Sequence, residues 1–517
     1  MRPPLPDLDG RQFDVVVIGA GINGCAAAEE LAAAGYATLL VDKRDFCSGS
    51  SSRSTRLLHC GLRYLASGGS PWAPLVEPHK FVGALAMAKK AMRCRAEFVG
   101  YAADRVRRFT FGYPLWRGQV YRPWQVDLAI RVLDALGGDE LPLDRGRLSP
   151  AEVATHPFYR HLRDQSALLG LNTFTEFQFN WPERIGMDMV LDAERLGAVA
   201  RNYTPVTRMQ RNAEAGWDLT LGDAHDPGAT ATVSAKLVVN TAGIWIDRVN
   251  KLGAERPVRK IFGTKGAHVV FRLPPECDGY GVIGVNREGV EPVYLVPWRH
   301  GLHYMAVTET VFEGDEDDIR ADDADIQWLL DEFNHLLPSL AKTRADVLWT
   351  WAGVRPLGHD PAFPKGKRVR EIHDLGDAGM PGVLAMTAGP IMTHRSAGRE
   401  LRDTVATRLK PSGTPRAPDY TPSPVGKDQS SPAVLNDYDG VRVADLRRFA
   451  ESEQVCSLTD LLARRAGLVW TTSNAREAAR SAAEAVADVL GWDAARIDAE
   501  VAGYHEYLDR QHGRPAA

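Results

Sequence analysis

A glycine-rich turn lies between an apolar run and an alanine-rich helix, in the segment Phe13-Asp-Val-Val-Val-Ile-Gly-Ala-Gly-Ile-Asn-Gly24. Gly19 permits a tight turn, Gly21 lets backbone approach phosphate oxygens, and Gly24 lets the helix pack closely against the strand. The N–H groups at the start of that helix attract an anion. After a second apolar run, Asp42 stands where a carboxylate accepts hydrogen bonds from a ribose. Together these residues predict a site for an adenine dinucleotide.

The elements that position this site follow from the pattern of apolar residues. The runs 13–18 and 38–41 are typical of buried parallel strands, and the helix between them is predicted to end near Gly35. Leu237-Val-Val-Asn-Thr-Ala-Gly243 is a further apolar strand that runs into a small-residue turn, as in flavoproteins whose strand returns to the same sheet. This strand and a serine-rich segment after Asp42 favour a flavin over NAD.

The rest of the chain divides by composition. Residues 1–10 are expected to form a disordered lead-in, and residues from about 70 to 170 show a helical pattern. Between about 258 and 375, β-rich runs at 267–271, 292–296 and 303–307 predict an antiparallel sheet that forms a separate substrate layer. A linker rich in Pro, Ser, Gly and Asp is predicted at 411–434. Residues 441–511 are helical in pattern, with a capped helix start at Ser457-Leu-Thr-Asp460.

Composition argues against several classes of protein. A length of 517 residues suffices for two or three domains. The formal net charge of −4 argues against a general nucleic-acid binder. The cysteines are scattered without metal-ligand spacing, so we expect a reducing compartment and no metal site. Since neither a signal-peptide core nor a run of about 18 apolar residues occurs, we expect a cytoplasmic chain that lies on a membrane surface at most.

Several motifs, in order along the chain, carry a family resemblance. The segment Asp45-Phe-Cys-Ser-Gly-Ser-Ser-Ser-Arg-Ser-Thr-Arg-Leu-Leu-His-Cys-Gly-Leu-Arg-Tyr-Leu65 closely resembles the second signature of FAD-dependent glycerol-3-phosphate dehydrogenases. The same family is resembled by Lys265-Gly-Ala-His268, by Trp349-Thr-Trp-Ala-Gly-Val-Arg-Pro-Leu357 and by Ser457-Leu-Thr-Asp-Leu-Leu-Ala-Arg-Arg465. The resemblance covers about residues 13 to 490, which makes it far more specific than the glycine turn alone.

The resemblance implies an α/β fold with an added α-helical domain. Its parts would be an FAD-binding, Rossmann-like domain of the glutathione-reductase type, an antiparallel substrate-binding sheet and a C-terminal helical domain. The oxidoreductase region would span residues 11–410, with FAD-binding segments at about 11–70, 196–250 and 380–410. Substrate-binding segments would lie at about 71–195 and 255–375. The linker 411–434 and the helical domain 435–517 would follow.

The resemblance further implies FAD as the cofactor and a phosphorylated small polyol as the substrate. The family oxidises the secondary alcohol of sn-glycerol 3-phosphate to dihydroxyacetone phosphate and passes electrons to a membrane quinone. Hydride transfer to flavin N5 requires the substrate C–H over the flavin ring, a proton acceptor and a clamp for the phosphate dianion. Arginine's planar fork matches phosphate oxygens best. A homodimer is compatible with the family.

A peripheral location on the inner face of the plasma membrane is a further implication. Residues 80–95 have apolar positions at helical spacing, with Lys89, Lys90, Arg93 and Arg95 clustered among them. Such a helix could rest on an anionic bilayer. A charge cluster is more often a solvated helix face, and that reading is the favoured one from the residues alone.

Residues that match the family's motifs are assigned its roles. His268 aligns with a histidine near the substrate hydroxyl and is the candidate base, although a hydrogen-bonded histidine on a sheet face is the alternative. Arg355 would lie at the reacting oxygen or at the phosphate. Further substrate contacts are implied for Arg63, Tyr64 and Arg370. The cofactor-binding residues implied are Gly19, Gly21, Ile22, Asn23, Gly24, Asp42, Lys43, Ser51, Ser52, Thr55, Leu57, His59, Val206, Gly243, Gly389, Ile391 and Met392.

Three segments depart from the family's usual pattern. His-Gly-Gly is His59-Cys60-Gly61 here, and we expect Cys60 to be a small buried hydrophobe. Gly-Gly-Lys-Leu-Thr-Thr becomes Ala388-Gly-Pro-Ile-Met-Thr-His394, so Pro390 replaces a lysine that contacts the substrate phosphate in the family. His394 is either a replacement donor or a solvent-facing histidine. The third departure replaces Gly-Thr-Thr-Asp with Ala306-Val-Thr-Glu-Thr310.

The lost lysine leaves the substrate open. One charge-assisted hydrogen bond is worth about 1.5–3 kcal/mol, so its loss requires either a clamp rebuilt elsewhere or a changed substrate. A longer polyol phosphate such as erythritol phosphate is therefore an alternative to glycerol 3-phosphate. A flavin oxidase or dehydrogenase of an amino or hydroxy acid is another, with Arg355 on a carboxylate. A non-catalytic flavin-binding protein is a third.

Overall fold

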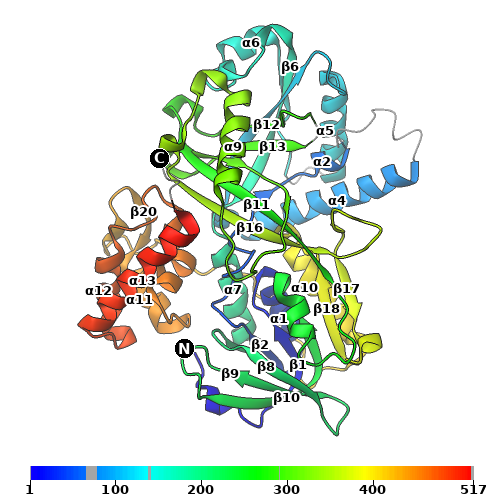
Figure 1. The fold of residues 1–517 in the computed structure, drawn as a ribbon, viewed down its shortest axis with the longest axis vertical. Helices are drawn as coiled ribbons and strands as arrows, with labels where there is room; N and C mark the ends of the chain where they lie inside the picture. Colours follow the sequence, from blue (N-terminus) through cyan, green and yellow to red (C-terminus); the bar gives the residue numbers. More distant parts are fainter. Residues whose placement is uncertain (1, 66–77, 138–140, 290, 514–517) are drawn as a thin grey trace.

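The computed structural model describes residues 2–65, 78–137, 141–289 and 291–513. Two sheets lie one above the other along the long axis, and a helical region packs at one side (Figure 1). The first sheet belongs to the nucleotide-binding region and the second forms a separate layer. None of the described helices is both long and apolar enough to cross a membrane.

The first sheet is mostly parallel and is centred on β1 (Gln12–Ile18). Its strand order is β17-β18-β10-β1-β2-β7, with a β8–β9 hairpin added against β10. Val15, Val16 and Val17 are all fully buried, because both faces of a parallel sheet are covered. The other strands are β2 (Thr38–Val41), β7 (Val199–Arg201), β8 (Val206–Arg211), β9 (Trp217–Gly222), β10 (Thr230–Asn240), β17 (Glu371–Asp374) and β18 (Val383–Thr387).

Helix α1 (Ile22–Ala33) packs between α7 (Pro182–Arg195) and α10 (His394–Ala406). Its alanine-rich surface permits close approach, since a Cβ at Gly398 of α10 would lie only 2.4 Å from Ala26 O. The short α8 (Ile246–Asn250) follows the turn after β10. These helices fix the carboxyl ends of β1, β2 and β10, where nucleotide sites form in such sheets.

The second sheet has the order β15-β11-β14-β13-β12-β4-β6-β3, with β16 on β11 and β5 on β6. Residues 267–271, 292–296 and 303–306 lie in its antiparallel strands β11, β13 and β14, as the sequence predicts. Its strands are β3 (Leu57–Leu58), β4 (Val106–Trp116), β5 (Gly146–Leu148), β6 (Leu168–Phe179), β11 (Ile261–Arg272), β12 (Tyr280–Val285), β13 (Pro292–Pro297), β14 (Leu302–Ala306), β15 (Thr310–Val311) and β16 (Trp349–Gly358).

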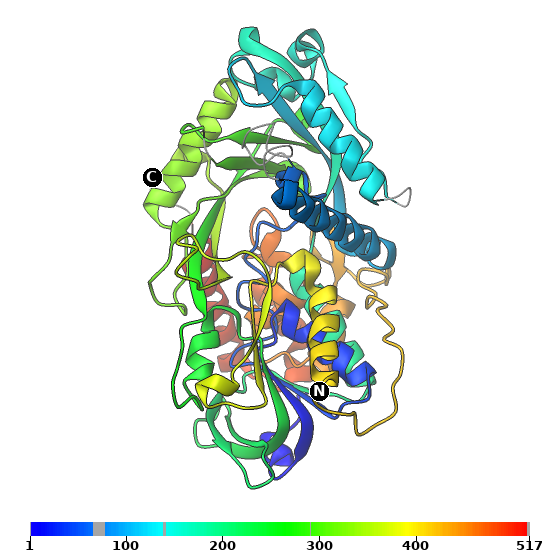
Figure 2. The same cartoon turned by 90° about the vertical axis from the view of Figure 1, so that its right-hand side faces the viewer.

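The helical prediction for residues 70–170 is wrong for residues 106–116, which form strand β4, although helices occur elsewhere in the same range. Strand β4 pairs with β6 along its whole length, from Val106 opposite Phe179 to Trp116 opposite Leu168. Adjacent arginines at 107 and 108 hide the period of two that marks a strand. Helices α2 (Leu62–Leu65), α4 (Pro78–Tyr101), α5 (Pro123–Gly137), α6 (Pro150–Thr155) and α9 (Asp323–Leu336) accompany this sheet. In both views α4 lies between the two sheet regions (Figures 1 and 2).

The disordered lead-in is also wrong, because the N-terminal residues contribute to a core. Leu5 and Leu8, in a short 3-10 helix, are buried against the first sheet. Arg201 Nε donates a hydrogen bond to Pro3 O at 2.8 Å and fixes the segment. Residues 411–432, in contrast, run without helix or strand along one side of the molecule (Figure 2).

The C-terminal region contains a two-stranded hairpin and several helices. Ser457 caps a helical segment as the sequence predicts, because Asp460 N donates to Ser457 Oγ at 3.1 Å and Ser457 N donates to Asp460 Oδ2 at 3.0 Å. The elements are β19 (Ala433–Leu435), β20 (Tyr438–Arg442), α11 (Val443–Ser452), a π-helix (Asp460–Arg465), a 3-10 helix (Leu468–Trp470), α12 (Ala479–Leu490) and α13 (Ala494–His512).

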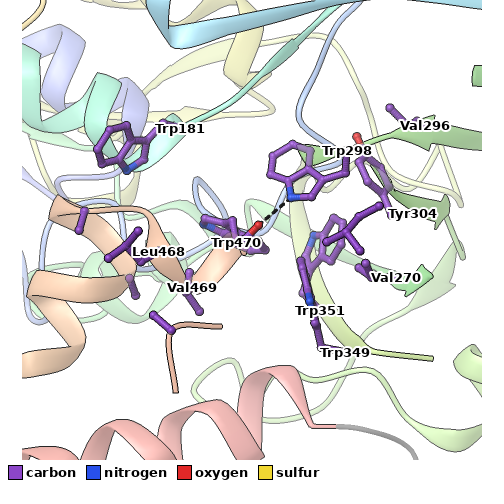
Figure 3. Close-up of a cluster of buried hydrophobic side chains, with 14 of the residues drawn as sticks. Trp181, Val270, Val296, Trp298, Tyr304, Trp349, Trp351, Leu468, Val469 and Trp470 are labelled. Atoms are coloured by element: carbon purple, nitrogen blue, oxygen red, sulfur yellow. Dashed lines mark hydrogen bonds between the residues drawn. The ribbon is translucent and has the colours of Figure 1, made fainter. Parts of the chain in front are cut away.

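A tryptophan cluster joins this region to the second sheet (Figure 3). Trp349 and Trp351 of β16 pack on Trp470, with ring centroids 5.7 and 5.6 Å away. Trp298 Nε1 donates to Trp470 O at 2.8 Å. The helical region and the sheet therefore share one buried core.

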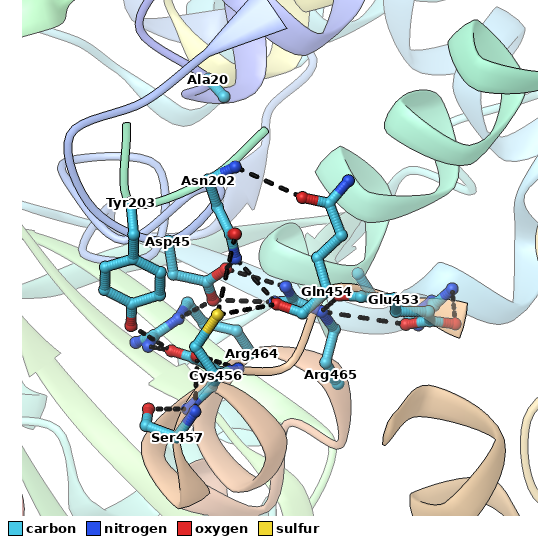
Figure 4. A network of polar contacts seen from close by, with 12 residues as sticks. Ala20, Asp45, Asn202, Tyr203, Glu453, Gln454, Cys456, Ser457, Arg464 and Arg465 are labelled. Atoms are coloured by element: carbon cyan, nitrogen blue, oxygen red, sulfur yellow. Dashed lines mark hydrogen bonds and ion pairs between the residues drawn. The ribbon is translucent and has the colours of Figure 1, made fainter. Parts of the chain in front are cut away.

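A buried ionic network joins the same region to the loop after β2 (Figure 4). Both Arg465 Nη atoms donate to the Asp45 carboxylate at 2.8 Å, and Arg464 forms a second ion pair with it. Asn202 Nδ2 also donates to Asp45, at 2.8 Å. Burial alone would raise the pKa of Asp45, but the two arginines hold it well below its ordinary value. The network keeps this loop, which lines the cavity described below, in place.

Candidate active site

A cavity of about 520 Å³ lies between the two sheets. Its walls come from the glycine turn, the loop 42–55, the turn after β10, strands β11 and β16, and residues 388–391. It opens at the carboxyl ends of the parallel strands, where the sequence predicts a dinucleotide. We therefore treat it as the candidate active site.

The glycine turn has the shape that a pyrophosphate requires. Gly19 has φ +98°, and a Cβ there would lie 2.6 Å from Ala242 Cα. A Cβ at Gly24 would lie 1.9 Å from Gly19 O, so helix and turn touch directly. At Gly21 a Cβ would point to Ser51 Oγ, 3.2 Å away, and both residues line the cavity. Backbone without side chains thus forms the cavity wall at the start of α1.

The carboxylate of Asp42 holds this wall together. Asp42 Oδ2 accepts from Ala20 N at 2.7 Å, and Oδ1 accepts from Arg44 N at 2.9 Å. Burial raises the pKa of Asp42 to about 6, although the two backbone hydrogen bonds favour the ionised carboxylate and lower the pKa. Asp42 also lines the cavity, where a ribose hydroxyl could reach its remaining lone pairs.

Two further contacts close the wall on either side of α1. Ile22 N donates to Ser51 Oγ at 2.9 Å. Asn23 Nδ2 donates to Gly389 O at 2.9 Å, and a Cβ at Gly389 would lie 2.4 Å from that nitrogen. The segment 388–391 can approach α1 only because residue 389 is glycine.

His268 and Arg355 lie on neighbouring antiparallel strands of the second sheet. His268 is opposite Trp351 in the register of β11 and β16, and Arg355 is opposite Thr264. The guanidinium of Arg355 lies beside Gly266, because a Cβ there would be 3.1 Å from Arg355 Nη2. Both residues line the cavity. Burial, and then the charge of Arg355, lower the pKa of His268 well below its ordinary value.

Most residues singled out from the sequence come together in this one cavity. His268 Nε2 lies 3.0 Å from the hydroxyl of Thr55, which also lines it. The predicted residues that line the cavity are Gly19, Gly21, Ile22, Asn23, Asp42, Lys43, Ser51, Thr55, His59, Tyr64, Val206, Gly243, His268, Arg355, Gly389 and Ile391.

Other predicted residues are not among those that line the cavity. Ser52 donates to Gly49 O at 3.0 Å, and Met392 belongs to the core around α1. Gly24 packs against the glycine turn, and Leu57 lies in β3. Arg63 is on α2, but its side chain lies outside the described residues.

Two of the substrate residues suggested by the sequence are engaged elsewhere. Arg370 Nε donates to Glu400 Oε2 at 2.9 Å, and its Nη1 donates to Thr393 O at 3.2 Å. His394 is almost completely buried and donates from Nδ1 to Ile391 O at 2.7 Å. Neither residue is among those that line the cavity. His394 is therefore not the solvent-facing histidine considered above.

The cavity also includes residues that sequence reasoning missed. Arg368, two positions before Arg370, lines it and forms an ion pair with Glu309. Arg44, and Trp245 and Arg248 after the turn that follows β10, line it as well. The available signals were the arginines at 368, in the loop before β17, and at 44, two residues after Asp42. Cys60, which replaces a glycine of the family's pattern, is fully buried, and its backbone N donates to Glu176 Oε1 at 2.8 Å.

Comparison with known proteins identifies the family. The profile described as "FAD dependent oxidoreductase" matches residues 14–395. The chain belongs to this family. FAD is accordingly its cofactor, and the glycine turn, Asp42 and the cleared wall at Gly21 fit that dinucleotide.

Within the FAD-dependent oxidoreductases, several relatives match almost the whole chain. The glycerol-3-phosphate dehydrogenase of Synechocystis sp. is 26% identical over 98% of this chain and 98% of its own. Glycerol-3-phosphate dehydrogenase 2 of Mycobacterium tuberculosis is 28% identical over 96% of this chain and 88% of its own.

Solved structures of FAD-dependent oxidoreductases share the fold. The glycerol-3-phosphate dehydrogenase of Bacillus halodurans, complexed with FAD, has a TM-score of 0.72 at 20% identity, covering 98% of this chain and 96% of its own. The L-alpha-glycerophosphate oxidase of Mycoplasma pneumoniae, with FAD bound, has a TM-score of 0.60 at 16% identity, covering 80% and 98%. The larger coverage of the former includes the C-terminal helical region.

Proposed function

We propose that this FAD-dependent oxidoreductase oxidises the secondary alcohol of a polyol phosphate. The reaction favoured is sn-glycerol 3-phosphate to dihydroxyacetone phosphate. The observation that carries the proposal is the joint placement of Arg355 and His268 in the cavity that the glycine turn also lines. Near full-length relatives named glycerol-3-phosphate dehydrogenases support the substrate class.

His268 is the group we assign to the hydroxyl proton. When bound, FAD supplies the hydride acceptor. Since burial and the charge of Arg355 keep the pKa of His268 low, its imidazole is neutral at pH 7 and can accept a proton. The hydroxyl of Thr55, 3.0 Å from His268 Nε2, orients the ring. A protonated imidazole formed beside Arg355 would return its proton readily to solvent.

Arg355 and Arg368 are the cations we assign to the phosphate. Both line the cavity, and guanidinium groups bind phosphate oxygens in pairs. Arg368 takes the role that the sequence suggested for Arg370, because Arg368 lines the cavity, whereas Arg370 is not among the lining residues and is held by Glu400 and Thr393. Arg63, whose side chain is not described, keeps its proposed substrate contact.

A four-carbon substrate such as erythritol phosphate is the second candidate. Pro390 lines the cavity where the family has a lysine, and its ring carries no charge or donor. A clamp without that cation could hold its phosphate farther from the flavin, which suits a longer polyol.

The electron acceptor we propose is a quinone at a membrane surface. Helix α4 exposes Val82 (64%) and Met87 (40%) beside Lys89 and Lys90, and Met87 also lines the cavity. An apolar face with cations suits an anionic bilayer. Two experiments test this acceptor: binding of the holoenzyme to anionic vesicles, and reduction of a quinone by the holoenzyme. The mass of the holoenzyme in solution tests the proposed homodimer.

The substrate is tested by anaerobic titration of the yellow holoenzyme with three-, four- and five-carbon polyol phosphates. Bleaching of the flavin by one chain length at low concentration supports the proposal and selects the substrate. Bleaching by an amino or hydroxy acid alone would overturn it in favour of that oxidoreductase class. A flavin that no donor or artificial acceptor turns over would indicate a non-catalytic flavoprotein.

A further inference from the structure

One acidic side chain gathers several donors at the end of the cavity near Asp42. Asp317 lies between β15 and α9, outside the nucleotide-binding sheet. Its Oδ1 accepts from Lys43 Nζ at 2.7 Å, from Arg44 Nη2 at 2.8 Å and from Trp245 Nε1 at 2.9 Å. Its Oδ2 accepts from Arg248 Nη1 at 2.9 Å.

All four donor residues line the cavity. Lys43 and Arg44 directly follow Asp42, while Trp245 and Arg248 follow the turn after β10. The donors thus lie in segments that follow β2 and β10 of the nucleotide-binding sheet, and the carboxylate comes from a segment between β15 of the second sheet and α9. One side chain joins both regions at this end of the cavity.

The charges require such a partner. Three cations converge here, and burial lowers the pKa of Lys43, which measures the cost of keeping its charge. Burial would raise the pKa of Asp317, but the bond from Lys43 and the nearby charges hold it below its ordinary value. Arg248 also pairs with Asp315 and Glu316. Without Asp317, however, the ammonium of Lys43 and the guanidinium of Arg44 would repel each other and move toward solvent.

The same contacts fix the indole of Trp245. Lys43 Nζ lies over its ring, 4.4 Å from the centroid, while Asp317 accepts from its Nε1. On another side, a Cβ at Gly49 would lie 3.0 Å from the ring. An aromatic plane held in this way is a rigid wall at the end of the cavity where Asp42 and Val206 lie.

We propose that Asp317 is a positioning residue for the adenosine half of FAD. By pairing with Lys43, Arg44, Trp245 and Arg248, it holds the wall against which the adenosine rests and closes this end of the cavity. The cofactor then leaves only when these contacts open. The proposal concerns FAD retention and is independent of the polyol substrate.

The segment is held from its other side as well. Arg510 of α13 donates from Nε to Asp318 Oδ1 at 3.2 Å, and Arg53 Nη1 donates to Ile319 O at 3.3 Å. Asp317 therefore lies on a segment that is anchored by its neighbouring residues. Its contacts can keep this end of the cavity closed without a large movement of the segment.

The test is the rate at which FAD leaves the holoenzyme, measured by the return of flavin fluorescence with no substrate present. Asp317→Asn keeps the size but removes the charge, so we expect about 10- to 100-fold faster release, as for a lost set of charged hydrogen bonds. Asp317→Glu should restore part of the retention. Release from the native protein should accelerate with salt, and this dependence should shrink in Asp317→Asn.

Glu313→Gln is the matched control. Glu313 is an exposed acidic residue of the same segment that does not pair with Lys43, Arg44, Trp245 or Arg248, so its variant should release FAD at the native rate. The apoprotein melting temperature separates positioning from folding: in Asp317→Asn it should stay native, while the increase caused by FAD becomes smaller. Native release rates in Asp317→Asn, or an equal loss of melting temperature with and without FAD, would overturn the proposal. Because no donor is oxidised, failure of the substrate assignment would leave these results unchanged.

Discussion

The imidazole of His268 lies flat on the indole of Trp351, with ring centroids 4.1 Å apart and 3° between the planes. Trp351 Nε1 also donates to Ser54 O at 3.2 Å, next to the Thr55 hydroxyl that meets His268 Nε2. One tryptophan therefore fixes both the candidate base and the cavity loop beside it. This stack links the tryptophan core of the molecule to its chemistry.

Replacing Trp351 should impair turnover more than substrate binding. In Trp351→Leu the imidazole loses its stack and the loop loses a hydrogen bond, so kcat should fall about 10- to 100-fold as the base shifts by a fraction of an ångström. KM should change less than about 2-fold, since the arginines are untouched. Trp349→Leu removes a similar buried ring that does not stack on His268. Equal kcat values for the two variants would refute the positioning role.

Two arginines in one loop offer a matched comparison. Arg368→Gln removes a cavity-lining cation and should raise KM for the phosphorylated substrate about 10-fold or more, with kcat less affected. Arg370→Gln removes the partner of Glu400 and should lower the melting temperature while KM stays near native. Steady-state kinetics of both variants over a substrate series distinguishes the two roles. A raised KM in Arg370→Gln with a native KM in Arg368→Gln would assign the phosphate to Arg370 instead.

Pro390→Lys tests whether the missing family lysine explains substrate choice. The backbone at Pro390 has φ −60° and ψ 142°, which lysine adopts without strain. A new ammonium at the cavity wall should lower KM for glycerol 3-phosphate about 10-fold, equivalent to about 1.4 kcal/mol. KM for a four-carbon phosphate should change less. An unchanged KM for both substrates would show that position 390 does not face the phosphate.

The buried Glu176 should make stability depend on pH. Burial raises its pKa from 4.5 to about 7, with the charge of Arg95 opposing. Between these values the unfolded chain releases the proton while the native chain keeps it, so the unfolding free energy falls as pH rises. The loss amounts to about 3 kcal/mol above pH 7.

Glu176→Gln cannot titrate, and its amide keeps an oxygen to accept from Cys60 N. Relative to the native protein, this variant should gain about 3 kcal/mol of unfolding free energy between pH 5 and pH 8. Urea denaturation of both proteins across that range measures the difference. If the unfolding free energies of the two proteins change in parallel with pH, Glu176 has the pKa of an ordinary carboxyl group in the folded protein, and the prediction is wrong.

The parts predictable from sequence were those set by local backbone geometry. The spacing of Gly19, Gly21 and Gly24 predicts their roles, because a strand, a tight turn and a helix must follow in that order. The β-rich runs of β11, β13 and β14 likewise indicate strands through their β-branched and aromatic residues. Strand β4 was not predicted, because Arg107 and Arg108 interrupt the alternation of apolar and polar residues that indicates a strand.

Contacts between distant segments were beyond sequence reasoning. Arg368 and Arg370 share one loop, but Arg370 turns to Glu400 and Ser396 of α10 while Arg368 lines the cavity. Asp317 lies 274 residues from Lys43, so no local pattern pairs them. Leu5 and Leu8 likewise follow no periodic pattern in the sequence, and they are buried because the first sheet, including β10, packs against them.

The reaction proposed for this protein is oxidation of the carbinol of a phosphorylated polyol. Anaerobic rapid mixing of the holoenzyme with sn-glycerol 3-phosphate, or with its C2-deuterated form, tests it most directly. We expect flavin bleaching that is several-fold slower with deuterium, and none with unphosphorylated glycerol at the same concentration. If neither this substrate nor a four-carbon polyol phosphate bleaches the flavin, while an amino or hydroxy acid does, the protein is not a polyol-phosphate dehydrogenase.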